Sequence, residues 1–558
     1  MRKIICLLLA ASLIGLLGGC FGQGTHNALA SLYDMTFALA DAGGIDVHGF
    51  RLDAVDLIAA NGEVVRGPVD GIIALPNTQQ PRPLVVIFHG ASRMGHENIR
   101  SRVYAGFDYL VAQLAAEGYV TMSINVNINH AFELGESLYT NGWAMDTFDA
   151  HIAALAQANA GEDVGHGIDL TGRIDLEQIH FIGHSRGGDI AAWLARRERE
   201  TGQTRIASIL HLASAANTFY PLYDSPDVDT NVDLADFAQP DIPMGFILPE
   251  YDGDVAFLDG QGVFDEIFAA AQNRHMANVV FLRGGGHNFF NRMITVDDRH
   301  GDLSHANPND QSTWLSREEH EEFLLHYAAA FLAVVTGQRE PWGTFNAAEP
   351  QPATLFGFAA TASTYIPGTQ LLIAAPSEGL GVHTARTAQA SYFVQSFPAQ
   401  AVGHGLFNHP AVLARRDPQL PLYAITWDSR NSAIEFALMR NDLTQASAIS
   451  LFVGVDSSDA RNTIGGYQSF SVGLRDAHGE EQFVHIPAGT SALFTHRGEV
   501  FPVEDFDDIW LGHTPLGELR IPLRYFDEID LASVQRLTLR FDQTRTGAVM
   551  LSGAHLVP

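Results

Sequence analysis

A serine flanked by glycines lies at residues 183–188, in the order Gly, His, Ser, Arg, Gly, Gly. An apolar run at residues 179–182 precedes it and an amphipathic stretch follows, which predicts a turn between a strand and a helix. Such a turn strains the backbone of Ser185, and the glycines let the strand and the helix approach closely. The amino end of the helix also stabilises developing negative charge. We therefore expect Ser185 to be a nucleophile; a structural turn that contains serine is the alternative.

A serine hydroxyl needs a general base, and the base needs a carboxylate that orients it. Two later apolar runs end in suitable residues, in the required chain order. Residues 279–282 are closely followed by three glycines and His287, the expected base. Residues 244–248 are followed by Asp252 and Asp254. Asp252 lies nearer the strand end and is the predicted acid, while Asp254 is the alternative and could instead bond its own turn.

An acyl-transfer site also needs two N–H donors for the oxyanion of the tetrahedral intermediate. The backbone N–H of Arg186, directly after the serine, is one expected donor. The other is expected from Ala91, which follows His89 and Gly90 after the apolar run at residues 84–88. We expect His89 to pack within this loop. Together these roles describe acyl transfer through a covalent acyl-enzyme, for which we expect no metal or other cofactor.

The elements that must position these residues alternate between short apolar runs and longer amphipathic stretches. This alternation is typical of an α/β domain with a doubly wound, mostly parallel sheet. At the carboxyl edge of such a sheet, Ser185, Asp252 and His287 are expected to converge. The predicted strands are residues 84–88, 119–124, 179–182, 206–212, 244–248 and 279–282, and the predicted helices are residues 104–118, 144–160, 188–202, 263–277 and 316–337.

The pattern changes near residues 338–350, where prolines punctuate the chain and long amphipathic stretches end. We expect residues 21–340 to form the catalytic domain and residues 345–558 to form an all-β sandwich with an accessory role. Short alternating segments separated by turn residues predict that sandwich, at residues 433–438, 449–453, 467–472 and 537–541.

Three aromatic residues of the second region, Trp427, Tyr467 and Trp510, could contact a carbohydrate or a polymer by stacking. The alternative, which we favour, is that they pack in the core of the sandwich.

The beginning of the chain predicts an export signal, because Arg2 and Lys3 precede an apolar run at residues 4–17. Residues 17–20, Leu-Gly-Gly-Cys, resemble the lipobox of bacterial lipoproteins, in which the cysteine is acylated after cleavage. We therefore expect residues 1–20 to be a lipoprotein signal peptide and Cys20 to carry a lipid anchor at the outer membrane, the cell surface or in the periplasm. An uncleaved anchor helix is less favoured because the run is shorter than the roughly 20 residues that span a bilayer.

Charge and cysteine content exclude several classes of function. The formal net charge is −31 and the only lysine is Lys3, so nucleic acid is a poor partner. Because the only cysteines are Cys6 and Cys20, the processed chain has no thiol for a disulfide, a nucleophile or a zinc ligand. An acidic string could bind calcium, but its spacing matches no cation loop and we favour a solvated face for Asp224, Asp227, Asp229, Asp233 and Asp236.

Five ordered motifs make residues 69–337 resemble the secreted branch of the dienelactone-hydrolase, chlorophyllase and polyester-hydrolase superfamily. The resemblance covers about half of the chain. It implies an α/β-hydrolase fold and an esterase or lipase-like activity without a cofactor, at an open or lightly covered site. The spacing from Asp252 to Val255 resembles the acid turn of many members. The motifs are residues 88–90, residues 114–120 with 123–125, residues 183–188, residues 252–255 and residues 286–291.

Residues 127–145, 215–239 and 292–313 each follow the carboxyl end of a strand and are expected to overhang the site. The leading hypothesis is hydrolysis of a small-molecule, lipid-like or polymeric ester. An amidase or peptidase with the same triad, or a binding lipoprotein with an inert hydrolase domain, are the alternatives. No sequence feature separates ester from amide, because both pass through the same tetrahedral species. The aromatic and apolar residues that could form an acyl pocket, or pack locally, are Phe132, Leu138, Tyr139, Trp143, Phe219, Tyr220, Phe289 and Phe290.

Overall fold

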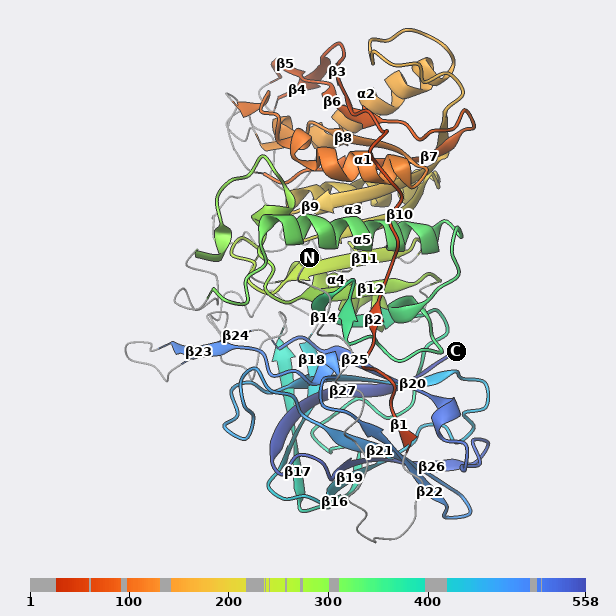
Figure 1. Ribbon diagram of the computed structural model, residues 1–558, viewed down its shortest axis with the longest axis vertical. Coiled ribbons are helices and arrows are strands. Elements are labelled where there is room, and N and C mark those ends of the chain that lie inside the picture. Colours follow the sequence, from red (N-terminus) through yellow and green to blue (C-terminus); the bar gives the residue numbers. More distant parts are fainter. Residues whose placement is uncertain are drawn as a thin grey trace, which may run out of the picture.

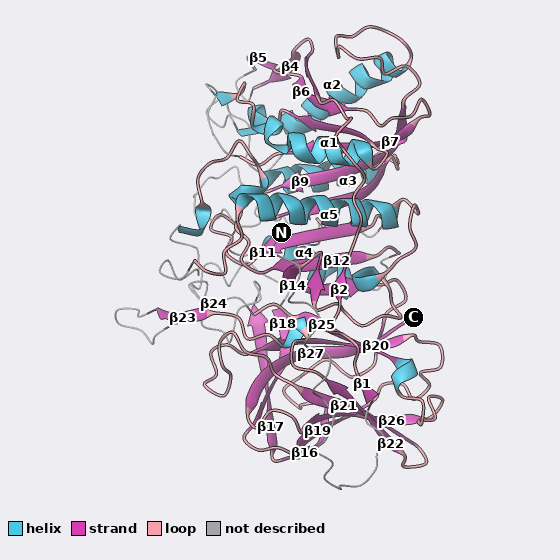
Figure 2. Cartoon of the chain, viewed as in Figure 1, coloured by secondary structure: helices cyan, strands magenta, loops and turns pink. Residues whose placement is uncertain are grey.

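A computed structural model of the chain combines a large, mostly parallel sheet flanked by helices with separate antiparallel sheets (Figure 1). The long helices lie in the part of the molecule built around the large sheet (Figure 2). The structure describes residues 27–59, 62–91, 98–130, 142–216, 235, 237–239, 241–255, 258–270, 274–300, 311–396, 419–501, 509–512 and 514–558.

The large sheet is built on a parallel centre. Its strands are β2 (Asp34–Met35), β3 (His48–Arg51), β6 (Asp70–Ala74), β7 (Arg82–Phe88), β8 (Val120–Ile124), β9 (Ile174–His184), β10 (Ile206–Leu212), β11 (Met244–Pro249), β12 (Ala277–Leu282), β13 (Thr354–Leu355) and β14 (Phe358–Tyr365). Their order in space is β2-β13-β14-β12-β11-β10-β9-β7-β8-β6-β3. The strands from β8 to β12 run parallel, and β6 and β14 pair antiparallel at the two sides. The predicted strands and the predicted parallel sheet are confirmed.

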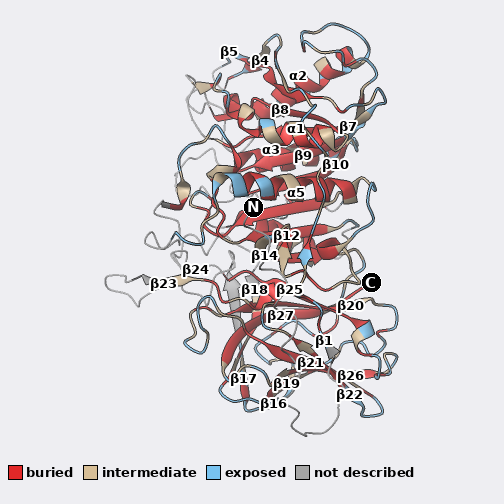
Figure 3. Ribbon diagram, viewed as in Figure 1, coloured by how far each residue is buried: buried red, intermediate tan, exposed pale blue. Residues whose placement is uncertain are grey.

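The central strands are buried on both faces, which explains their continuous apolar sequences. In β7, Leu84, Val86 and Phe88 pack in one core, whereas Val85 and Ile87 pack in the core on the other side of the sheet. Figure 3 shows these buried strands between helices that keep an exposed outer face. Helices α2 (Gly142–Asn159), α3 (Arg186–Glu200) and α4 (Asp259–Ala269) pack on the first core, and α1 (Asp108–Ala116) and α5 (Arg317–Val335) pack on the second.

Local signals set several helix ends. Helix α5 begins at a capping box, in which Ser316 Oγ accepts the N–H of Glu319 and the Glu319 carboxylate accepts the N–H of Ser316. Helix α4 begins earlier than the helix predicted at residues 263–277 and ends at Ala269, and Ala277 belongs to β12. Short 3₁₀ turns are η2 (Val103–Phe107), η3 (Asn127–His130), η7 (Asn288–Phe290), η8 (Asp298–His300), η9 (Gly343–Phe345), η11 (Ser491–Leu493) and η12 (Leu523–Tyr525).

The C-terminal region folds into two sheets that enclose their own core, which agrees with the expected β-sandwich. Leu451 and Leu551 of one sheet meet Val472 and Leu539 of the other in this core. One sheet has the order β1-β22-β21-β26-β19-β16, and the other has the order β17-β18-β27-β20-β25 with β15 beside β27. Their strands are β1 (Asn27–Ala28), β15 (Gln370–Leu371), β16 (Val382–Arg386), β17 (Ala388–Ser396), β18 (Gln419–Trp427), β19 (Ser432–Ala437), β20 (Ala448–Val455), β21 (Phe470–Asp476), β22 (Glu481–Ile486), β25 (Gly517–Pro522), β26 (Val534–Phe541) and β27 (Gly547–Val557).

Two hairpins stand apart from these sheets. Strands β4 (Val55–Ile58) and β5 (Val64–Gly67) form one of them, and β23 (Gly498–Phe501) and β24 (Ile509–Gly512) form the other. The first hairpin packs its buried face beside the start of α2.

A buried polar seam joins the large sheet to the sandwich. Strand β14 lies beyond the boundary expected at residues 338–350, yet it pairs with β12 as the next strand of the large sheet. The N–H of Thr364 in β14 donates to Glu518 of β25 at 2.9 Å. Arg520 donates to both carboxylate oxygens of Glu518, at 2.8 and 2.7 Å, and both side chains are fully buried. The large sheet therefore continues past that boundary, and the Thr364–Glu518 hydrogen bond ties it to a buried ion pair within β25 of the sandwich.

Candidate active site

Ser185 lies at the sharp turn between β9 and α3. Its backbone has φ 54° and ψ −125°, a conformation that a residue with a Cβ rarely adopts. A Cβ on Gly183 would lie 2.4 Å from the Cα of Gly188, and a Cβ on Gly187 would lie 2.2 Å from the carbonyl oxygen of Phe88. The glycines are therefore required because the strand, the turn and the helix touch one another through their backbones. The strand-turn-helix geometry predicted for this serine is present.

The loop after β7 lies against the same serine. A Cβ on Gly90 would come within 2.6 Å of the Cβ of Ser185, so only glycine permits this approach. Ala91 follows Gly90, and in the described part of the chain its N–H donates to no acceptor. Arg186 is the first residue of α3, so its N–H lies in the first helical turn, directly after Ser185. Both amides predicted to bind an oxyanion are thus placed on elements that touch Ser185.

Asp252 and His287 form a buried hydrogen-bonded pair. The Nδ1–H of His287 donates to Asp252 Oδ2 at 3.0 Å, and the two residues are 1% and 2% exposed. The other oxygen of Asp252 accepts the N–H of Asp254 at 3.0 Å and that of Val255 at 2.6 Å, which fixes the carboxylate. Burial raises the pKa of Asp252, although the charge and hydrogen bond of His287 oppose this rise. The predicted acid and base are therefore brought together by the ends of β11 and β12.

The imidazole of His287 lies beside the serine turn. Its ring centroid is 4.8 Å from that of His184, the residue before Ser185. The Nε2–H of His184 donates to the backbone oxygen of His287 at 3.0 Å. Burial lowers the pKa of His184 well below its usual range, so this ring is neutral. His184 was predicted only as part of the serine motif, and the structure adds a contact between that motif and the base.

Nε2 of His287 faces Asp254 in this structure. The distance from Nε2 to Asp254 Oδ2 is 3.5 Å, and the Asp254 side chain is 59% exposed. No hydrogen bond joins Nε2 to the hydroxyl of Ser185, both of which belong to the described residues. Burial disfavours the charged imidazole, but Asp252, Asp254 and Asp298 together raise the pKa of His287 above its ordinary value. Asp252 thus contacts Nδ1, the nitrogen that an orienting carboxylate binds in a catalytic triad. Asp254 lies at Nε2, the nitrogen that would accept the proton of the nucleophile.

Asp298 is a residue of this region that no sequence motif predicts. Its carboxylate accepts three backbone N–H groups, from Gly253, His287 and Asn288, each at 2.9 Å. No side-chain motif signals such a role, because the partners are main-chain groups. Residues 292–300 were expected to overhang the site, but this part of the segment packs against the loops that carry Asp252 and His287.

Several residues proposed to shape a pocket pack locally instead. Trp143 is buried and donates its indole N–H to the oxygen of Ile58 at 3.2 Å. Phe290 is fully buried. The guanidinium groups of Arg299 and Arg317 lie 5.1 and 4.5 Å from the ring centre of Phe289. The remaining proposed pocket residues, Phe132, Leu138, Tyr139, Phe219 and Tyr220, lie outside the described residues, as do Cys20 and the acidic string Asp224, Asp227, Asp229, Asp233 and Asp236.

The aromatic residues of the sandwich have local partners too. Trp427 is 1% exposed and stacks on Phe541 with ring centroids 4.0 Å apart, which confirms the core position that we favoured. Tyr467 packs on Phe494, and its hydroxyl accepts long hydrogen bonds from Arg283, the residue that follows β12. The side chain of Trp510 lies outside the described residues.

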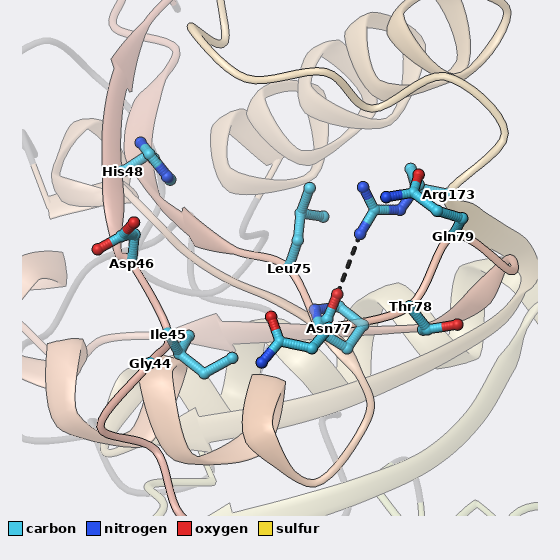
Figure 4. A pocket seen from close by; sticks show the side chains of 10 residues that line it. Gly44, Ile45, Asp46, His48, Leu75, Asn77, Thr78, Gln79 and Arg173 are labelled. Atoms are coloured by element: carbon cyan, nitrogen blue, oxygen red, sulfur yellow. Dashed lines mark hydrogen bonds between the residues drawn. The ribbon is translucent and has the colours of Figure 1, made fainter.

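A hollow of about 580 Å³ lies at the opposite edge of the large sheet (Figure 4). It is lined by residues that follow β6 and precede β9, including Asn77 and Arg173, and by His48. Arg173 donates to the oxygen of Pro76 at 3.0 Å. Because Ser185 lies at the carboxyl end of β9 and Arg173 lies at its amino end, this hollow is separate from the candidate site.

The described residues contain no cluster of three His, Cys, Asp or Glu side chains arranged to hold a metal ion. Among these residues, no helix has both the length and the apolar character to cross a bilayer.

The chain matches no protein-family model and no curated protein sequence.

Proposed function

We propose that the chain is a serine hydrolase with the α/β-hydrolase fold that cleaves carboxylic esters through an acyl-enzyme on Ser185. The observation that carries this proposal is the strained Ser185 at the β9–α3 turn, with the buried Asp252–His287 pair at the same edge of a parallel sheet. The chain order of serine, aspartate and histidine supports it, because this order accompanies the serine turn in that fold. The contact between His184 and His287 supports it further, since it holds the base beside the nucleophile.

Acylation begins when Nε2 of His287 takes the proton of the Ser185 hydroxyl. The serine oxygen attacks the ester carbonyl carbon, and the carbonyl electrons move onto its oxygen. The N–H groups of Ala91 and Arg186 would receive this oxyanion. The intermediate collapses by breaking the bond to the alcohol oxygen, which takes the proton from His287 Nε2–H. Asp252 keeps Nδ1 protonated throughout and stabilises the transient imidazolium.

Deacylation repeats these steps with water. His287 takes a proton from water, whose oxygen attacks the acyl carbon, and the bond to Ser185 breaks as His287 returns the proton to the serine oxygen. The products are an alcohol and a carboxylic acid, and the enzyme returns to its starting state.

Nε2 must turn from Asp254 to Ser185 before the first proton transfer. Catalytic hydrogen bonds are often long or poorly aligned in a free enzyme and tighten when substrate binds. Asp254 can release the ring without loss of a buried partner, because its own side chain is largely exposed. The imidazole of His287 therefore exchanges a contact with the solvated carboxylate of Asp254 for a hydrogen bond with the hydroxyl of Ser185.

The direct test compares wild-type protein with Ser185→Ala on p-nitrophenyl esters of increasing acyl length and on matching p-nitroanilides. We expect ester turnover that Ser185→Ala lowers by about 10⁴-fold or more, because the nucleophile is removed. A fluorophosphonate probe should add its phosphonyl group to the tryptic peptide that contains Ser185, as judged by mass spectrometry.

The outcomes separate the competing functions. Turnover of anilides alone would replace the esterase by an amidase or peptidase with the same residues. Absence of turnover on both panels together with absence of probe labelling would favour a binding protein with an inert hydrolase domain.

A further inference from the structure

One carboxylate joins the loop of the acid to the loop of the base. Asp298 Oδ2 accepts the N–H of Gly253 and the N–H of His287, each at 2.9 Å. Asp298 Oδ1 accepts the N–H of Asn288 at 2.9 Å. Gly253 directly follows Asp252, so one side chain fixes the main chain at the acid and at the base together. Charge-assisted hydrogen bonds of this kind are stronger than neutral ones.

The segment that carries Asp298 is itself held firmly. Arg299 is 4% exposed, and its guanidinium donates to the oxygens of Gly284 and Leu315, at 3.1 and 2.9 Å. Asp297 accepts two hydrogen bonds from the same guanidinium, both at 2.8 Å. The guanidinium also lies 4.5 Å from the ring centre of Trp314. The contacts of Asp297 and Arg299 therefore fix the backbone on either side of Asp298, which holds its carboxylate in place.

Both catalytic loops carry a glycine where this segment lies against them. A Cβ on Gly253 would be 2.1 Å from the backbone oxygen of Asp298. A Cβ on Gly286, the residue before His287, would be 2.8 Å from Cγ of Arg299. The two loops thus approach the segment as closely as their backbones allow, which leaves little room for independent motion.

We propose that Asp298 is a positioning residue of the site, which sets the distance and angle between the carboxylate of Asp252 and the imidazole of His287 through the backbones of both loops. The inference rests on the proposed function for its catalytic consequence, but the positioning itself concerns the Asp252–His287 hydrogen bond. Asp298 touches no reacting atom in this scheme.

The test replaces Asp298 by Asn and uses Asp476→Asn as a matched control. An asparagine presents an NH₂ group to at least one of the three N–H donors, so it cannot accept from all of them. Asp476 of the sandwich also accepts three backbone N–H groups, from His478, Glu480 and Asp530, at 2.8, 3.1 and 3.2 Å. Both substitutions should lower the midpoint of thermal unfolding, but only Asp298→Asn lies next to the candidate site.

The spectroscopic readout is the low-field proton resonance of the His287 Nδ1–H, identified by its absence in His287→Gln. We expect Asp298→Asn to move this resonance upfield or to broaden it by faster exchange, whereas Asp476→Asn should leave it unchanged. In parallel, kcat for a p-nitrophenyl ester should fall about 100-fold in Asp298→Asn, as expected when a reacting group is misplaced by about 1 Å, with KM within a few-fold of wild type.

A wild-type resonance together with a wild-type kcat in Asp298→Asn would overturn the proposal. Equal losses of kcat and of the resonance in Asp476→Asn would also overturn it, because the effect would then follow global stability. If wild-type protein hydrolyses no ester, the proposed function fails, and the resonance alone still decides whether Asp298 positions His287.

Discussion

At the scale of residues, the notable feature is one imidazole among three carboxylates. Asp252 accepts from Nδ1 of His287, Asp254 lies 3.5 Å from Nε2, and Asp298 accepts from the backbone N–H. Burial works against the imidazolium, but the combined negative charge holds the pKa of His287 above its ordinary value. The neighbouring His184 is neutral and adds no opposing charge. If His287 is the general base, a raised pKa keeps it protonated up to a higher pH, and only above that pH can its neutral form accept the proton of Ser185.

Removal of the most exposed of these charges should therefore extend activity to lower pH. In Asp254→Asn, the imidazolium loses one stabilising carboxylate, the pKa of His287 falls, and the neutral base is available at lower pH. We expect the acidic limb of the kcat/KM profile to move down by about half a pH unit, a small shift because a solvated charge is screened. The measurement is kcat/KM for a p-nitrophenyl ester across the acidic limb at low and high salt, with a smaller shift at high salt.

Asp56→Asn is the control for this charge effect, because its side chain is also 59% exposed but pairs with Arg66 in the β4–β5 hairpin. That variant should keep the wild-type profile. An acidic limb that stays in place or moves up in Asp254→Asn would show that Asp254 does not act on the base.

The sequence predicts residues with a chemical role better than residues with a supporting one. The positions of Ser185, Asp252 and His287 at strand ends could be predicted, because the proposed acyl transfer requires these residue types there in a set order. Asp298 could not, since it recognises main-chain N–H groups that every sequence contains. The contact between Glu250, two residues before Asp252, and His496 of the sandwich was equally hidden, because these two residues are 246 positions apart in the chain.

At the scale of elements, strands buried on both faces are the predictable part. In strands such as β7 and β11, the side chains are mostly apolar and only the backbone needs hydrogen-bond partners, which the sheet supplies. Their sequence alone therefore predicts them. Strand β14 is different, because it is rich in Ala, Ser and Thr and lies where the sheet meets the sandwich. Ser363 donates to the oxygen of Leu516 at 3.0 Å, and Thr361 donates to that of Ser491 at 3.3 Å. The side chains of Thr361 and Ser363 have these partners only once the sandwich is in place, so no local pattern predicts the strand.

The ion pair beneath β14 should be costly to break. In Glu518→Gln, Arg520 keeps a buried charge without a carboxylate, and the acceptor for the N–H of Thr364 is weakened. We expect the free energy of unfolding to fall by about 3 to 5 kcal/mol, the range for removing one partner of a buried pair. Urea unfolding followed by tryptophan fluorescence measures it.

Asp428→Asn provides the comparison for an exposed pair in the same sandwich. Asp428 binds Arg461 at 2.8 Å, but its side chain is 72% exposed, so its loss should cost about 1 kcal/mol or less. If the two variants lose the same free energy of unfolding, the buried ion pair contributes no more to stability than a surface contact does.

At the scale of the whole molecule, the sandwich reaches the loops that carry the proposed acid and base. The Nδ1–H of His496 donates to Glu250 at 3.0 Å, and both side chains are buried. Glu250 lies two residues before Asp252 and also accepts the N–H of Gly284, in the loop that leads to His287, at 2.9 Å. The guanidinium of Arg283 lies 4.1 Å from the ring centre of Phe494. The C-terminal region is thus part of the support of the site, a role that its sequence did not suggest.

Substitution of His496 by Ala should therefore affect both stability and turnover. Burial opposes the ionisation of Glu250, but the contacts from His496 and Gly284 hold its pKa below the ordinary value. A carboxylate whose pKa is lower in the folded protein than in the unfolded chain stabilises the folded state at pH values above its pKa in the unfolded chain. This stabilisation is lost as the pH falls through the pKa of the carboxylate in the folded protein. The stability difference between wild type and His496→Ala should accordingly be largest near neutral pH, about 3 kcal/mol or more, and should shrink in acid.

Turnover should fall several-fold in the same variant, because Glu250 no longer holds the acid loop against the base loop. His478→Ala is the matched control, since His478 forms a looser, 3.8 Å pair with Asp530 and its side chain is 73% exposed. That control should leave unfolding and turnover near wild type. A stability loss in His496→Ala that stays constant from neutral to acidic pH would assign the effect to lost packing and would remove Glu250 from the link between the sandwich and the site.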